Sequence, residues 1–135
     1  MRVDFYHLVK NKNRDMFLYK LLTKALSQKN EILVHLGSQQ EAEELDTQLW
    51  VLDDEAFLPH SILDDSYEEA PIQLHYAGPL PEEAHRDVLI CLSDKIPDFY
   101  KDFKRVIHVS MLPETLVPHR KFYQAQAAEM YEHEI

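Results

Sequence analysis

Glycine is scarce in this chain: there are 2 among 135 residues, Gly37 and Gly78, and they lie far apart. The two common phosphate-binding motifs, Gly-x-Gly-x-x-Gly and Gly-x-x-x-x-Gly-Lys-Ser/Thr, are therefore absent. Ser38 is spaced from Glu41 as in a capping box, so these two side chains should occupy the free amides of that helix start. We therefore expect no nucleotide site and no cofactor.

Cysteine is equally rare, since Cys91 is the one thiol in the sequence. A single cysteine excludes an intramolecular disulfide framework and a thiol-rich zinc site. It lies in the apolar run 87–92, where burial in a core strand is the expected position of a free thiol. Such a thiol fits a reducing compartment, and we expect a cytoplasmic location.

Long apolar runs are also missing. No stretch approaches the roughly 18 uninterrupted apolar residues of a membrane-spanning helix, so no membrane contact is expected. The first residues, 1–9, include Asp4 within a short apolar run, unlike a signal peptide. A chain of this length can bury a sizeable core, and we expect residues 1–135 to form one domain.

Positive charge is in short supply. There are 14 Lys and Arg residues against 24 Asp and Glu residues, for a formal net charge of -10. Such a surface repels phosphate, so contact with nucleic acid should be mainly indirect, and an acidic ligand would need a local basic patch. The densest basic and aromatic cluster is 119–123, His-Arg-Lys-Phe-Tyr.

The chemistry-bearing residues form no local catalytic or metal-binding motif. There are 8 histidines, and none is spaced from another as in His-x-x-x-His. Those on expected strands could still converge in space: His7, His35, His75 and His108. There is no Gly-x-Ser-x-Gly elbow, and acid pairs such as Asp64-Asp65 fall in loops. We expect no catalytic residue and no metal site.

Hydrophobic periodicity predicts alternating strands and helices. The expected strands are 2–9, 32–36, 72–76, 87–92 and 105–109, the last being the final strand. The expected helices are 14–29, a capped helix from Ser38 through Trp50, short turns within 97–103, and a final helix from Pro113 that includes the helix-favouring stretch 119–131. Pro118 should kink that helix or delay its start. The order predicts a three-layer α/β fold: an open, mostly parallel sheet with helices on both faces, Rossmann-like but without a nucleotide site.

Two segments at fixed spacing carry a family resemblance. Residues 45–50 read Leu-Asp-Thr-Gln-Leu-Trp and residues 57–60 read Phe-Leu-Pro-His. The combination of Leu-Asp-x-x-Leu-Trp, a short spacer and Phe-x-Pro-His resembles the chi subunit family of the bacterial DNA polymerase III holoenzyme. Val-Leu-Ile-x-Leu-Ser at 88–93 and Arg-Lys-Phe-Tyr-Gln-Ala at 120–125 agree with it, so the resemblance covers essentially the whole chain.

The resemblance implies a non-catalytic DNA-replication adaptor of the clamp-loader complex. Such an adaptor binds the psi subunit of the clamp loader and the acidic C-terminal tail of the single-stranded-DNA-binding protein. On this reading Arg120 clamps the carboxylate of the tail, and Lys121 attracts its acidic residues. Tyr123 and Trp50 then wall a pocket for the terminal phenylalanine of the tail.

The resemblance implies a second surface for psi, formed by Phe57, Leu58 and Pro59 with His60 beside them. Trp50 and Phe57 could each belong to the core instead. Two other functions stay open at this point. One is a nucleotide- or metal-using α/β enzyme whose site is built from residues distant in sequence. The other is a protein-interaction module unrelated to replication.

Overall fold

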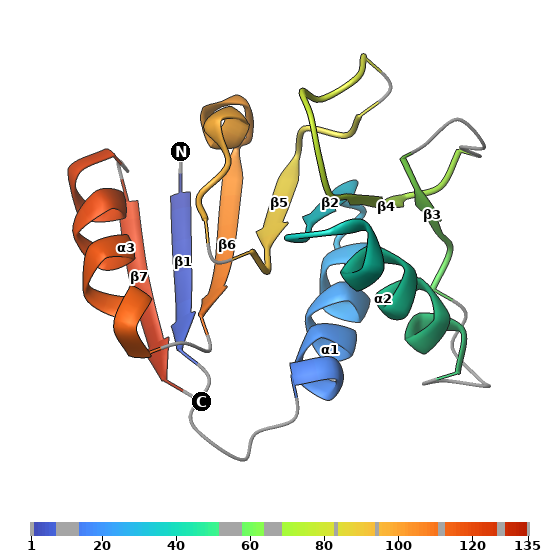
Figure 1. Ribbon diagram of the computed structural model, residues 1–135, viewed down its shortest axis with the longest axis horizontal. Helices are drawn as coiled ribbons and strands as arrows, with labels where there is room; N and C mark the ends of the chain where they lie inside the picture. Colours follow the sequence, from blue (N-terminus) through green and yellow to red (C-terminus); the bar gives the residue numbers. More distant parts are fainter. Residues whose placement is uncertain are drawn as a thin grey trace.

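The computed structural model describes residues 2–7, 14–51, 58–63, 69–82, 84–93, 95–110, 113–126 and 129–134 (Figure 1). Its strands are β1 (Arg2–His7), β2 (Ile32–His35), β3 (His60–Ile62), β4 (Ile72–His75), β5 (Val88–Cys91), β6 (Arg105–Ser110) and β7 (Glu129–Glu134). Its helices are α1 (Arg14–Ser27), α2 (Gln39–Val51), the short 3-10 helix η1 (Asp98–Asp102) and α3 (Pro113–Gln126).

The strands form one 7-stranded sheet in the order β3-β4-β2-β5-β6-β1-β7, and each of its strand pairs is parallel. The central strands are short apolar runs, because a parallel sheet covered on both faces must bury both sides of each strand. In β5, for example, all residues are buried, including Cys91. The predicted open, parallel α/β fold is confirmed.

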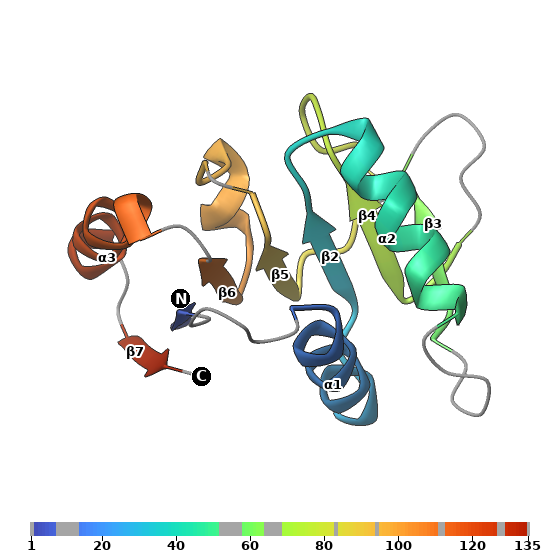
Figure 2. The ribbon, with the colours of Figure 1, turned by 60° about the horizontal axis from the view of Figure 1, so that its bottom comes forward.

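Strand alternation divides the core into two clusters, one on each face of the sheet. On one face, Val34, Ile90 and Ile107 pack with buried side chains of α1 and α2. On the other face, Leu89 and Val106 pack with Tyr100 of η1 and with α3. Figure 2 shows α1 on the opposite side of the sheet from α3, as the predicted three layers require.

The start of α2 confirms the predicted cap. Ser38 Oγ accepts a hydrogen bond of 3.2 Å from the Glu41 amide, which satisfies one free donor of the first turn. The Glu41 carboxylate in turn accepts a bond of 2.9 Å from the Gly37 amide. The protein's own side chains therefore occupy this helix start, as expected.

The C-terminal segment differs from the prediction. The helix begins at Pro113, runs through Pro118 and ends at Gln126, and β7 then pairs in parallel with β1. Residues 119–131 are therefore not one helix, and 105–109 is not the final strand. Pairing with the otherwise open edge of β1 outweighs the weak helix propensity of 129–131, since tertiary context overrides propensity.

The strand β3 was also missed by periodicity, because its 3 residues are too few to show alternation. It forms by pairing with β4 at the other edge of the sheet. The predicted end of the first strand, residues 8–9, lies outside the described residues. Among the helices that the structure describes, none has the length and apolar character needed to cross a membrane.

Candidate functional site

One candidate surface surrounds Trp50, at the C-terminal end of α2. Trp50 is 52% exposed, and its ring lies against the His60 imidazole with ring centroids 4.5 Å apart. His60 is buried: its Nδ1 lies 2.6 Å from the Leu58 carbonyl oxygen, and its Nε2 lies 3.1 Å from Asp46 Oδ1. Asp46 and Trp50 are one helical turn apart, so both reach the same imidazole from α2. The two motif segments, 45–50 and 57–60, therefore meet where Trp50 and Asp46 contact His60.

We call Trp50, Val51 and Pro59, with the buried His60 that supports them, the tryptophan surface. Val51 is 72% exposed and Pro59 is half-buried, so apolar groups meet solvent here. Leu58 instead lies in the core beneath, at 5% exposure. Phe57 lies outside the described residues.

A second candidate surface lies on α3. Arg120 Nε is 2.8 Å from Glu132 Oε1 of β7, and both side chains are partly exposed. The Nε atom is buried and makes no hydrogen bond among the described residues, so its contact with Glu132 is an ion pair. Lys121 and Phe122 beside it are exposed, as is Val117 one turn earlier. We call Val117, Arg120, Lys121 and Phe122 the α3 surface.

Tyr123 is fully buried beneath the α3 surface, at 0% exposure. Its hydroxyl is joined to His108 Nδ1 by a hydrogen bond of 2.8 Å, and its ring packs against Phe5. Burial, with smaller effects from Cys91 and Tyr100, raises the pKa of Tyr123 well above its usual range. Burial, with His119 adding to it, lowers the pKa of His108 to about 3. Tyr123 therefore anchors α3 to the sheet and does not line an open pocket.

The predicted pocket of Trp50 with Arg120, Lys121 and Tyr123 is wrong in its grouping. α2 contacts β3 and β4 at one end of the strand order, whereas α3 contacts β1 and β6 toward the other end. The two helices also contribute to different core clusters: Leu45 and Leu49 of α2 to one, and Tyr123 to the other. Figure 2 shows α2, which carries Trp50, and α3, which carries Arg120, toward opposite ends of the sheet, so the two residues lie far apart.

Two of the four strand histidines, His35 and His75, converge. His35 Nδ1 and His75 Nδ1 are 3.0 Å apart at the carboxyl ends of β2 and β4, and the edge of the Phe99 ring contacts both. Burial, with the neighbouring His75 adding to it, lowers the pKa of His35 to about 4, and burial lowers that of His75. His35 also borders a cleft of about 680 Å³. Among the described residues, no three His, Cys, Asp or Glu side chains are placed to hold a metal ion.

Sequence reasoning missed Asp46 and Glu132 as parts of these surfaces. Asp46 had a usable signal, since it precedes Trp50 by one helical turn inside the quoted motif. No sequence signal pointed to Glu132, because its contact with Arg120 depends on the pairing of β7 with β1.

Fold and surfaces together define the class: a doubly wound, parallel α/β domain that presents an exposed aromatic at one end of its sheet and a basic, partly apolar helix surface at the other. The family described as "DNA polymerase III chi subunit, HolC" matches residues 1–133. The chain belongs to this family, and its role is that of an accessory subunit in DNA replication.

Two relatives carry the same name, DNA polymerase III subunit chi. The one from Pseudomonas aeruginosa is 30% identical over 140 residues, covering 99% of this chain and 96% of the relative. The one from Haemophilus influenzae is 30% identical over 102 residues, covering 75% of this chain and 65% of the relative.

Proposed function

We propose that this protein is a non-catalytic adaptor with two protein contacts. One binds the psi subunit of the clamp loader, and the other binds the acidic C-terminal tail of the single-stranded-DNA-binding protein. The observation that carries the proposal is the separation of the tryptophan surface from the α3 surface at opposite ends of the sheet. Two separate surfaces allow both partners to be held at once, which is what an adaptor requires.

The tail contact is assigned to the α3 surface. The Arg120 side chain is partly exposed, so its guanidinium can form a charge-assisted bond to a terminal carboxylate in competition with Glu132. Lys121 supplies a second cation, while Val117 and Phe122 supply exposed apolar area for the terminal ring. Tyr123 acts from beneath by holding α3 against β6.

The energies of this contact are modest. Burying the ring contributes about 2 kcal/mol, and hydrogen bonds to charged groups contribute roughly 1.5–3 kcal/mol. Both cations lie at a partly exposed surface, so added salt should weaken the contact. A weak, salt-sensitive contact suits a partner that must be released.

The psi contact is assigned to the tryptophan surface. Pro59 and His60 lie beside Trp50, and Leu58 lies in the core beneath them. Phe57 completes the proposed set. We assign Trp50 to the psi contact and not to the tail contact, because it lies against His60 and not beside α3. Half-exposed tryptophans are frequent energetic centres of protein interfaces.

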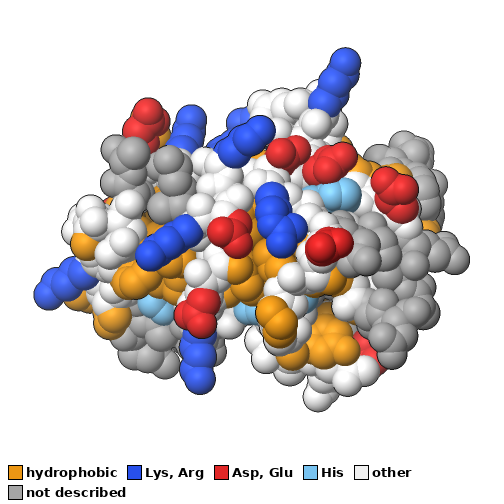
Figure 3. Space-filling model, turned by 90° about the horizontal axis from the view of Figure 1, so that it is seen from above, with side chains coloured by type: hydrophobic (Ala, Val, Ile, Leu, Met, Phe, Trp, Pro, Cys, Tyr) orange, Lys and Arg blue, Asp and Glu red, His pale blue; other side chains and the backbone are white. Residues whose placement is uncertain are grey.

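In this proposal the adaptor reaches coated DNA through the single-stranded-DNA-binding protein and not by contacting the DNA itself. The net charge of -10 opposes contact with phosphate. On the face shown in Figure 3, Lys and Arg side chains stand apart among Asp and Glu side chains and do not merge into a basic track.

The test is a titration of a fluorescent peptide ending in Asp-Ile-Pro-Phe, followed by anisotropy. The double variant Arg120→Ala with Lys121→Ala should bind it at least about tenfold more weakly, since one charged hydrogen bond is worth that much. Lys101→Ala with Lys104→Ala removes the same charge from outside the α3 surface and should change little. Unchanged affinity in the Arg120→Ala, Lys121→Ala variant would contradict the assignment of Arg120 as the carboxylate clamp.

A further inference from the structure

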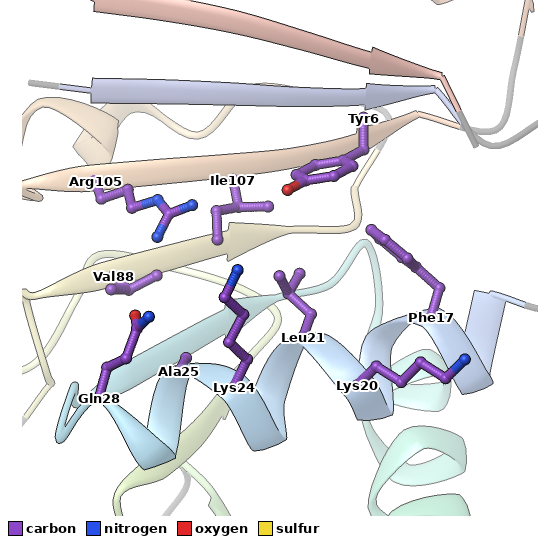
Figure 4. A pocket seen from close by; sticks show the side chains of 10 residues that line it. All are labelled: Tyr6, Phe17, Lys20, Leu21, Lys24, Ala25, Gln28, Val88, Arg105 and Ile107. Carbon is purple, nitrogen blue, oxygen red and sulfur yellow. The ribbon is translucent and has the colours of Figure 1, made fainter.

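A groove lies between α1 and the strands β5 and β6, with a volume of about 250 Å³ (Figure 4). Its apolar lining includes Tyr6 of β1, Phe17 and Leu21 of α1, and Ile107 of β6. The Tyr6 and Phe17 rings contact each other, with centroids 5.1 Å apart. Of the described helices on this face, α1 is the one that borders the groove, and it reaches β1 through the contact of Phe17 with Tyr6. The groove therefore has α1 as one wall and the sheet as the other.

The rim of this groove is basic on a strongly acidic protein. Lys20 and Lys24 line it from α1, and Arg105 lines it from β6. Figure 4 shows Lys24 directed from the helix toward the strands, with Arg105 reaching into the same space from the other wall. Neither lysine has a salt-bridge partner within the described ranges.

The acid nearest to Arg105 is already neutralised. Asp4 is buried, at 1% exposure, and its carboxylate accepts hydrogen bonds from Arg2, Arg105 and His133. Burial would raise the pKa of Asp4, but these three bonds outweigh it and hold the pKa below its ordinary value. One carboxylate thus serves both Arg2 and Arg105, and the groove keeps a net positive charge.

We infer that this groove is a docking site for an extended, acidic segment of a partner protein that carries one apolar side chain between its acids. Lys20 and Lys24 are one turn apart on α1, or about 6 Å along the helix axis. Side chains two residues apart in an extended chain point the same way and are separated by about 6.6 Å. One acid can meet Lys24 inside the groove and the next can meet Lys20, which extends along α1 below Phe17 (Figure 4), while the intervening side chain points toward the apolar wall at Ile107.

The occupant is a protein segment and not a nucleic acid. A nucleic-acid groove needs a track of cations along the backbone and platforms on which bases stack. This groove offers three cations that form no continuous track, and its Tyr6 and Phe17 rings pack against each other. The site is independent of the proposed tail contact, because α3 packs on the other face of the sheet.

The experiment uses the full chain and the labelled peptide Asp-Asp-Phe-Asp-Asp, with Asn-Asn-Phe-Asn-Asn as the uncharged control. In an NMR titration the acidic peptide should shift the backbone amides of Phe17, Lys24 and Ile107, and the control should not. Lys20→Ala with Lys24→Ala should weaken binding by about tenfold, because each partly exposed ion pair is worth less than a full tenfold. Lys20→Arg with Lys24→Arg should retain it.

Variants elsewhere separate this proposal from the tail contact. Lys101→Ala with Lys104→Ala, and Arg120→Ala with Lys121→Ala, should both leave peptide binding at the groove intact. Amide shifts confined to α3, or no binding of the peptide at all, would contradict the docking proposal for the groove. Neither result would contradict the assignment of tail binding to the α3 surface. Stronger shifts at the same amides with an oligothymidylate would overturn the docking proposal in favour of nucleic acid.

Discussion

The ring of Trp50 contacts the imidazole of His60, with centroids 4.5 Å apart and planes tilted by 46°. His60 is held in turn by Asp46 and by the Leu58 carbonyl. The contact with His60 therefore restricts the exposed tryptophan, and a partner that docks on it has fewer side-chain rotations to immobilise. Fixing an interface side chain beforehand reduces the entropy lost on binding.

Trp50 should report on one partner and not on the other. It is the single tryptophan of the chain and is half-exposed, so its emission should be red-shifted and readily quenched by acrylamide. Adding a psi subunit should shift the emission to the blue, because the indole loses contact with water. Adding the tail peptide should leave it unchanged. A blue shift with the tail peptide alone would contradict the separation of the two surfaces.

Glu132→Gln should strengthen tail binding. Glu132 competes with the ligand carboxylate for Arg120, and the ion pair between these partly exposed side chains is worth at most about 1 kcal/mol, or roughly fivefold in affinity. Glu129→Gln, in the same strand but away from Arg120, is the matched control and should have no such effect. Anisotropy titration measures both, and weaker binding by Glu132→Gln would argue against Arg120 as the carboxylate clamp.

Tyr123→Phe should destabilise the fold by about 1–3 kcal/mol, because it leaves the buried His108 nitrogen without its hydrogen bond. Thermal unfolding should show a loss of roughly 4 °C per kcal/mol. The control is Tyr100→Phe, since the buried Tyr100 hydroxyl has no hydrogen-bond partner among the described residues. It should be neutral or slightly stabilising, and equal losses in both variants would contradict this account.

Stability should fall as the pH is lowered from about 6.5 toward 4. Burial, helped by His75, lowers the pKa of His35 to about 4, and burial, helped by His119, lowers that of His108 to about 3. Between about pH 6.5 and 4, the two imidazoles bind protons in the unfolded chain but stay largely neutral in the folded chain, so protonation favours unfolding. Urea titrations across the range measure the slope, which should continue below pH 4 through His108.

His35→Gln is the variant that checks this origin. It should reduce the pH dependence between about 6.5 and 4 and leave the region below pH 4 largely as it was. Asp4 acts in that lower region: its pKa is depressed, so its stabilisation is present above its ordinary pKa of 3.8 and is lost as the pH falls further. A slope between 6.5 and 4 that is the same in His35→Gln would assign the effect to other groups.

The candidate site could be predicted in composition but not in arrangement. The motif around Trp50 and His60 and the basic cluster at Arg120 were identifiable from residue types and spacing. Which of them lie together was not, because that depends on strand order. Phe122 and Val117 carried no signal of exposure, since apolar residues on a helix are ordinarily assigned to its buried face.

Within the fold, the sequence alone determined what depends on near neighbours: the alternation of strands and helices, the buried run at 87–92 and the Ser38 cap of α2. Each of these follows from periodicity or capping within a few residues. Tertiary structure alone decided that 129–134 is a strand beside β1, that Tyr123 is buried, and that Trp50 and Arg120 occupy opposite ends of the sheet. These outcomes depend on pairings between residues more than 100 positions apart, such as Arg2 with Glu129, which no local pattern encodes.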